Sequence, residues 1–148
     1  MGGDSTLAGA NGGGAQGGGV YQRGGAVSLT NVTLQDNDAQ GGKGGPAEKI
    51  YDYFTHKWVR VGGFGGSAQA GGMYIDSTFY SSPPTVSLHN CIVTQNSASG
   101  AGGAGSSGGG LWLGPNIVVC LDAFTVANAT NNHASIGPDI DGSYTICP

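Results

Sequence analysis

The sequence predicts an all-β fold, a parallel β-solenoid of about three to four coils with one inserted loop, and three observations carry that prediction. A short segment recurs along the chain. Each copy follows a Gly-Gly step, and the apolar residues form strand-length runs of β-branched or aromatic side chains. The length of 148 residues suits one domain, so we take 1–148 as a single solenoid domain.

The composition favours an ordered chain. Glycine accounts for 31 residues, but 38% of the residues are hydrophobic, only 9% are charged and the net charge is −4. Disordered chains show the opposite balance of apolar and charged residues. With five Lys and Arg residues the chain has no basic surface for nucleic acid, and no apolar run reaches the roughly 18–20 residues that span a bilayer. We therefore expect neither a nucleic-acid partner nor membrane insertion.

The repeat is clearest in residues 26–39 and 85–98. Both segments contain Val-Ser-Leu-x-Asn, then Asn-x-Ala, and both continue into glycine. A third copy at 124–134 keeps the Asn-x-Ala, while its first half aligns in more than one register. The final Asn of each copy falls at Asn37, Asn96 and Asn132.

These asparagines set the period. Their spacing is 59 residues and then 36, so the unit has about 36 residues and the longer interval contains an insertion, residues 44–70. Alternation in Val-Ser-Leu indicates a strand with one buried face. Glycines cost about 1 kcal/mol each inside a helix, which argues against a helical repeat. Asparagines stacked from coil to coil are expected to form a hydrogen-bonded ladder.

At these residues the sequence resembles the right-handed parallel β-helix repeats of surface proteins, such as the chlamydial polymorphic outer-membrane proteins and autotransporter passengers. Gly-Gly-Ala-Val at 24–27 matches the family's first tetrapeptide. Leu-Gln-Asp-Asn at 34–37 and Val-Thr-Gln-Asn at 93–96 match its Phe-x-x-Asn tetrapeptide with an aliphatic residue in place of Phe. The resemblance implies a right-handed coil and an adhesive or scaffolding role outside the cell or at its surface.

The insertion is rich in aromatic and basic residues. Its candidate ligand-binding residues are Tyr51, Tyr53, Trp58 and Arg60. Aromatic side chains among a few charges suit sugar stacking or a protein contact, and loops on a solenoid often form its binding face. Two interpretations remain open: a recognition loop, or a flap that buries its aromatics against the flank of the coil.

Three cysteines and two sequons bear on the compartment. No pair of cysteines has the spacing of a zinc site. Cys91 is expected in the core, and Cys120 either pairs with Cys147 or all three thiols are free and buried. A disulfide indicates an oxidising compartment. Asn31 and Asn128 stand in Asn-x-Thr sequons and are the glycosylation candidates. In a protein secreted by a eukaryote we expect Asn128 to be the better one, because Asn31 also suits an inward turn of the repeat.

Catalytic and metal-binding patterns are weak. Two alternating acid pairs, Asp36 with Asp38 and Asp139 with Asp141, are the only candidates for glycosidase carboxylates, and both suit solvated turns better. The three histidines lack metal-ligand spacing. We predict no catalytic residue, no metal site and no cofactor, although some parallel β-helices are enzymes.

Two function hypotheses follow. The first is an extracellular structural or adhesive module that associates through its solenoid ends, because the N-terminal end has no evident cap, and either stacks into a fibre or forms part of a larger surface protein. The second is a carbohydrate-binding or carbohydrate-cleaving β-helix with the aromatic insertion as a groove wall. An ice-binding solenoid ranks last, because the threonines do not share one register.

Overall fold

The structure is a computed structural model that describes residues 1–76 and 84–148 and consists mainly of short β-strands. Most strands pair in parallel with strands far away in the sequence, and one hairpin is antiparallel. The fold is therefore all-β apart from one short helix, as predicted. Among the described residues no helix is long and apolar enough to cross a membrane.

The parallel strands form five sheets, which are described in the order in which the chain first reaches them. The first contains β1 (Ala15–Gln16), β8 (Ala68–Gln69) and β13 (Ser106–Ser107). The second contains β2 (Val20–Arg23), β9 (Met73–Asp76), β14 (Leu111–Leu113) and β17 (Ile140–Asp141). The third contains β3 (Ala26–Thr30), β10 (Thr85–His89), β15 (Val118–Asp122) and β18 (Thr145–Cys147). The fourth contains β4 (Thr33–Gln35), β11 (Ile92–Thr94) and β16 (Ala129–Thr130), and the fifth β5 (Asp38–Gln40) and β12 (Ser97–Ser99).

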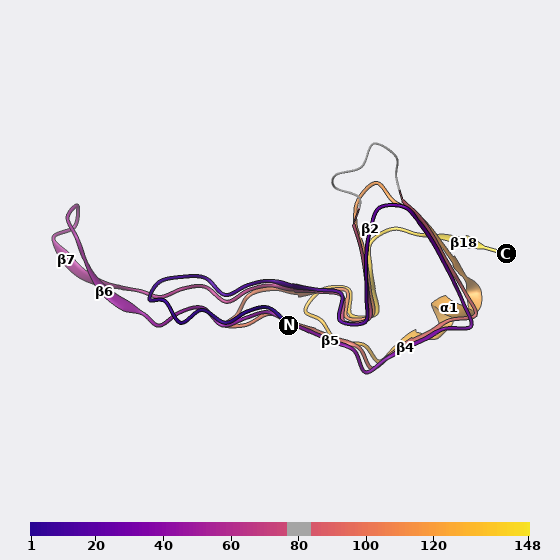
Figure 1. Cartoon of the computed structure of the whole chain (residues 1–148), viewed down its shortest axis with the longest axis horizontal. Helices are drawn as coiled ribbons and strands as arrows, with labels where there is room; N and C mark the ends of the chain where they lie inside the picture. Colours follow the sequence, from indigo (N-terminus) through magenta and orange to yellow (C-terminus); the bar gives the residue numbers. More distant parts are fainter. Residues whose placement is uncertain (77–83) are drawn as a thin grey trace.

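The chain passes through these sheets in the same order each time. We call residues 15–40 the first pass, 68–99 the second, 106–133 the third and 136–147 the partial fourth. In Figure 1 the passes superimpose and outline a triangle, from which a long arm leads to β6 and β7. The predicted copies align as expected, since Val27 pairs with Val86 and Leu29 with Leu88.

Only the second half of the third copy pairs with the earlier copies, through β16. The strand that pairs with β10 is β15, and the first half of the copy, whose register the sequence leaves open, is part of α1 (Ala123–Ala127). Asp122 caps this helix: its Oδ1 accepts from the Thr125 backbone N–H at 2.7 Å. The predicted insertion also includes β8, so its last residues belong to the stacked sheets.

Asp122 makes stability sensitive to acid. The hydrogen bond from the Thr125 side chain, followed by those from the backbone N–H groups of Thr125 and Asn90, holds the pKa of Asp122 below its ordinary value of 3.8. Because the pKa is lower in the folded protein, the unfolded chain binds the proton more readily. The hydrogen bonds to the Asp122 carboxylate therefore stabilise the fold fully above the ordinary pKa of 3.8, and this stabilisation is lost as the pH falls through the lowered pKa. We expect Asp122→Asn to weaken the fall in melting temperature between about pH 5 and pH 3. Asp36→Asn, an exposed turn variant, serves as the control, and equal acid profiles for both variants would contradict this assignment.

The size of the interior side chains decreases from the triangle toward the arm. Inside the triangle lies an aliphatic cluster that includes Met73, Ile75, Leu88 and Leu111, all fully buried. Where β1, β8, β5 and β12 approach one another, the buried side chains are alanines, namely Ala15, Ala39, Ala68 and Ala98. Beyond them the segments are held together by glycine. Side-chain volume therefore sets how closely the facing segments approach.

We call residues 1–14, 41–47, 62–67 and 100–105 the glycine arm. Several of its backbone N–H groups donate to neighbouring segments at a spacing of three residues: Gly42 to Gly13 and Gly45 to Ala10, then Gly63 to Gly45 and Gly66 to Gly42. A three-residue period without internal hydrogen bonds is that of a polyproline II helix. The arm therefore resembles a bundle of extended helices joined mainly through their backbones, with side-chain bonds from Asp4 and Asn11.

Close approach explains why the arm needs glycine. A Cβ on Gly45 would lie 1.8 Å from the Leu7 carbonyl oxygen, and one on Gly66 would lie 1.9 Å from that of Gly13. No side chain fits there, as at the axis of collagen. Gly3 and Gly105 face open space instead.

Two ladders of side chains run across the passes. Asn37 Nδ2 donates to Asn96 Oδ1 at 2.8 Å, and Asn96 Nδ2 donates to Asn132 Oδ1 at 2.9 Å, which is the ladder that the repeat predicts. Asn132 Nδ2 then donates to Asp139 Oδ1 at 3.0 Å. On another sheet Tyr74 stacks between Tyr21 and Trp112, with ring centroids 5.2 and 4.5 Å apart. Burial, followed by the charge of Asp76, raises the pKa of Tyr74 to about 12.

Candidate binding face

The insertion ends in an antiparallel hairpin at the tip of the glycine arm. Strand β6 (Glu48–Asp52) pairs with β7 (Lys57–Val61), and in Figure 1 both lie at the far end of the arm from the triangle. Asp52 orders the turn, because its carboxylate accepts from the Phe54 N–H at 2.9 Å and from the Thr55 hydroxyl at 2.7 Å. These bonds, the Thr55 hydroxyl first, lower the pKa of Asp52.

The strand pairing separates two faces of different chemistry. Residues directly opposite across an antiparallel pair share a face, and the faces alternate along each strand. The pairs Tyr51 with Trp58 and Lys49 with Arg60 therefore lie on one face. The other face carries three further pairs: Glu48 with Val61, Ile50 with Val59 and Asp52 with Lys57.

We call Lys49, Tyr51, Tyr53, Trp58 and Arg60 the cationic aromatic face. Tyr51 lies in its middle and contacts Tyr53 and Trp58 edge to face, with ring centroids 5.1 and 5.5 Å away. Such contacts fix the orientation of the rings. The face contains two cations and no carboxylate.

The aromatic side chains of the tip are open to solvent. Tyr53 is 80% exposed, Trp58 67% and Phe54 99%. A flap that covers the coil would bury them, so that interpretation of the insertion is wrong and the recognition loop is the one consistent with the exposure. The alternation of the sequence is compatible with both, because it fixes which residues share a face and not where the hairpin lies.

Charge is also segregated between the tip and the rest of the chain. Residues 48–61 hold three basic and two acidic side chains, a net charge of +1 that leaves −5 on the remainder. The long arm holds the weakly positive hairpin away from the acidic triangle. An anionic partner would therefore be attracted to the tip more than to the rest of the molecule.

All four candidate ligand-binding residues predicted from the sequence lie together on this face. Sequence reasoning did not select Lys49. The signal for it is the antiparallel register: a hairpin that pairs Tyr51 with Trp58 must also pair Lys49 with Arg60.

The chain matches no protein-family model, no curated protein and no solved structure.

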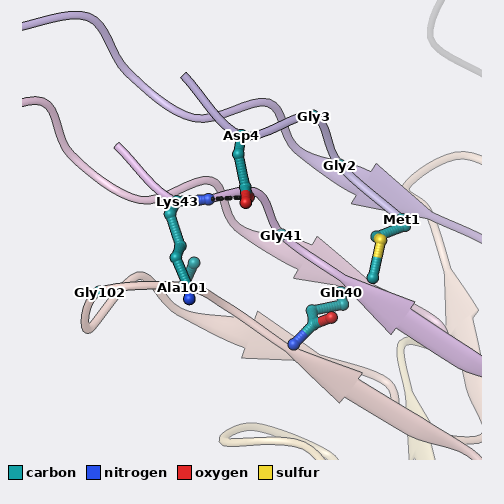
Figure 2. Close-up of a pocket in the computed structure, with 9 residues that line it drawn as sticks. All are labelled: Met1, Gly2, Gly3, Asp4, Gln40, Gly41, Lys43, Ala101 and Gly102. Carbon is teal, nitrogen blue, oxygen red and sulfur yellow. Dashed lines mark hydrogen bonds between the residues drawn. The ribbon is translucent and has the colours of Figure 1, made fainter. Parts of the chain in front are cut away.

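A hollow lies where the first residues run beside residues 40–43. Figure 2 shows its lining, which is largely glycine backbone with the side chains of Met1, Asp4, Gln40 and Lys43. The Asp4 carboxylate is already engaged, because its Oδ1 accepts from the Lys43 backbone N–H at 2.7 Å. We regard this hollow as the groove between neighbouring arm segments.

Cys120 and Cys147 form a disulfide that joins β15 to β18, with Cα atoms 5.6 Å apart. Of the two alternatives that the sequence leaves open, the structure contains the pair. Cys91 is a free, buried thiol in the core. His89 lies beside the disulfide: a ring nitrogen of His89 and the two cysteine Sγ atoms are within 4.8 Å of one another. The two sulfurs are bonded to each other and so are not available to a metal.

Removal of this disulfide gives a testable loss of stability. It closes a loop of 27 residues, and such a bond stabilises by about 3 kcal/mol through the entropy of the unfolded chain. We expect the Cys120→Ser, Cys147→Ser variant to lose about that much in urea unfolding. Unfolding of the wild type in a thiol reductant should give the same value, and no loss in either experiment would contradict a stabilising role.

Both sequons stand where the chain enters the fourth sheet, Asn31 before β4 and Asn128 before β16. Asn31 is exposed and its Oδ1 accepts from Asn90 Nδ2 at 2.5 Å. Asn128 ends α1, is half-buried, and its Nδ2 donates to the Phe124 carbonyl at 2.8 Å. Asn31 is thus the more accessible of the two, in contrast to the sequence-based preference for Asn128.

Proposed function

We propose that this chain is a β-solenoid module of the cell exterior, with a structural and adhesive role, which contacts its partner through the hairpin at the tip of the glycine arm. The single observation that carries the adhesive role is the exposed cationic aromatic face at the end of a long arm. Exposed aromatic side chains with Arg are typical of contact hot spots. At the tip of the arm these aromatic side chains do not contribute to the buried core.

The solenoid is supported by the order of the passes. The passes cross the sheets in the same order, the fourth only in part, and the pairing is parallel and in register. The Asn ladder and the aromatic stack add side-chain contacts of the same repeat. The resemblance to surface β-helix repeats leads us to propose a right-handed coil.

The extracellular location is supported by the disulfide, since such bonds persist in oxidising compartments. The bundle of backbone-bonded glycine helices in the arm offers few side chains to a protease. Both features suit a protein that functions outside the cell.

Self-association is proposed at one end of the stack. At the first pass β2, β3 and β4 pair with a strand on one side only, and Tyr21 is 48% exposed. Within residues 1–76 and 84–148, Asn37 Oδ1 accepts no hydrogen bond. At the other end Asp139 terminates the Asn ladder with a carboxylate, and Asp141 pairs with Trp112 in place of a further aromatic. Strands β16, β17 and β18 at that end also pair on one side only, so the two ends differ in their side-chain ladders and not in their strand edges. A ladder that is open at one end only favours dimers over long fibres.

The adhesive role is tested by coating beads with the whole chain and measuring their retention under flow. The surfaces are coated with a neutral polysaccharide, an anionic polysaccharide or a protein. We expect retention on at least one surface, and loss of that retention in a Tyr53→Ala, Trp58→Ala variant with unchanged circular dichroism. Retention that does not depend on these two side chains would overturn the proposal.

Sedimentation velocity of the same preparations tests self-association: we expect a monomer–dimer equilibrium, and regular fibres in electron micrographs would contradict the closed end.

A further inference from the structure

We propose that the cationic aromatic face binds an anionic polysaccharide, a chain of sugars that carry carboxylate or sulfate groups. This inference rests on the proposed adhesive function and names the class of partner.

The first argument is the pair of cations at the base of the hairpin. Lys49 and Arg60 lie directly opposite each other, and like charges in that position destabilise a strand pair. Both side chains are exposed, and among the described residues neither forms a salt bridge with a carboxylate. An anionic group bound between them would neutralise this repulsion, so the hairpin is arranged to gain from an anion.

The second argument is the aromatic surface next to these cations. Tyr51 holds Tyr53 and Trp58 by edge-to-face contacts, and both outer rings remain largely open to solvent. The C–H face of a pyranose ring packs well on such rings. Along the strands, the Cα atoms of Trp58 and Arg60, and those of Tyr51 and Lys49, are about 6–7 Å apart, because residues two apart share a face. A sugar that stacks on Trp58 can therefore present its acidic group to Arg60.

The third argument is the size and shape of the face. A standard protein interface uses roughly 20–30 residues from each partner, whereas the whole hairpin spans residues 48–61 and five side chains form the face. None of the described pockets is lined by residues of the hairpin, and small ligands need concave sites. A linear polymer can gain affinity from several repeats without being enclosed. The acidic triangle would repel such a polymer, and the arm holds the tip away from it (Figure 1).

The test uses matched probes that differ in charge alone. Binding of the whole chain to dextran sulfate is compared with binding to dextran, and binding to polygalacturonate with binding to its methyl ester, by biolayer interferometry. We expect binding to at least one anionic polymer and none to its neutral partner, with affinity that falls as salt rises. The two pairs distinguish sulfate from carboxylate as the recognised group.

Variants on the two faces of the hairpin provide the control. We expect Lys49→Gln, Arg60→Gln and Trp58→Ala each to weaken binding about tenfold or more. Lys57→Gln removes a cation from the opposite face and should change the affinity less than about twofold. All four side chains are exposed, so circular dichroism is expected to stay constant.

Three results would overturn the inference: equal binding of charged and neutral polymers, equal loss in Lys57→Gln and Arg60→Gln, or tighter binding of poly-glutamate or a single-stranded oligonucleotide. Beads that adhere through Tyr53 and Trp58 without preference for anionic polysaccharide would leave the adhesive function standing and remove only the ligand class. If the beads do not adhere at all while dextran sulfate binds in solution, the ligand class stands and the adhesive function is removed.

Discussion

Asn96→Ala is expected to lower the free energy of unfolding by about 4 kcal/mol, which corresponds to about 12 °C in the melting temperature. Asn96 is 0% exposed, and its side chain takes part in bonds to three residues of the neighbouring passes. Its Oδ1 accepts from the Asn37 backbone N–H and Nδ2, and its Nδ2 donates to the Leu34 carbonyl and to Asn132 Oδ1. The variant leaves these groups without their partner, and an unpaired buried polar group costs about 1–3 kcal/mol.

Gln35→Ala is the matched control for that experiment. It removes another amide-to-amide bond between the first two passes, from Gln35 Nε2 to Gln95 Oε1 at 2.7 Å, but this bond is exposed to water. We expect a change within about 0.5 kcal/mol, because solvent replaces the lost partner. Differential scanning calorimetry measures both variants. Similar melting temperatures for Asn96→Ala and Gln35→Ala would contradict a structural role of the buried ladder.

Gly66→Ala is expected to separate the segments of the glycine arm. The new Cβ would lie 1.9 Å from the Gly13 carbonyl oxygen and 2.5 Å from its carbon, both backbone atoms that cannot turn aside. Overpacking of this kind costs about 3 kcal/mol or more, and the arm has no side-chain core that can absorb it. Hydrogen exchange measured by mass spectrometry should show loss of protection in the peptides that contain Gly42, Gly45 and Gly63. Peptides of the triangle should keep their protection, because its aliphatic core is not touched.

Gly3→Ala isolates the steric effect. Gly3 lies in the same arm, and no atom lies within 4 Å of the position that its Cβ would take. Both substitutions reduce the freedom of the unfolded chain alike, so their difference reports the contact in the folded arm. Equal exchange in the two variants would show that the arm does not depend on the close approach of its backbones.

The sequence predicted the parts of the fold that depend on alternation and on recurring residue types. Val27 and Val86 occupy one register because their copies share a strand pattern, and the Asn ladder follows from Asn at one place in each repeat. The four candidate residues of the insertion lie together because a hairpin places alternate residues on one face. These features are local, or repeat locally, and so they can be read from the chain.

The features that escaped prediction depend on contacts between distant segments. The glycine arm has a signal, Gly-Gly-Lys-Gly-Gly-Pro at 41–46 and Gly-Gly-Phe-Gly-Gly-Ser at 62–67, which is the period of a polyproline II helix. That signal has the wrong period for a strand or an α-helix. Helix α1 is only five residues long and depends on its cap by Asp122, so no apolar periodicity announces it. The exposure of Trp58 follows from the length of the arm, which no side chain of the hairpin encodes.

The Asn ladder also has an electrical direction. In the side-chain bonds of the ladder, each amide donates to the later pass, and Asn96 and Asn132 accept from the earlier one, so the side-chain dipoles add along the stack as peptide dipoles add along a helix. The positive end of this row meets the carboxylate of Asp139, where an anion is most stabilising. The negative end is the oxygen of Asn37 on the first pass. A partner that covers the first pass is therefore stabilised if it places a donor, an N–H or a cationic side chain, at the Asn37 oxygen. A carboxylate at that position would be repelled.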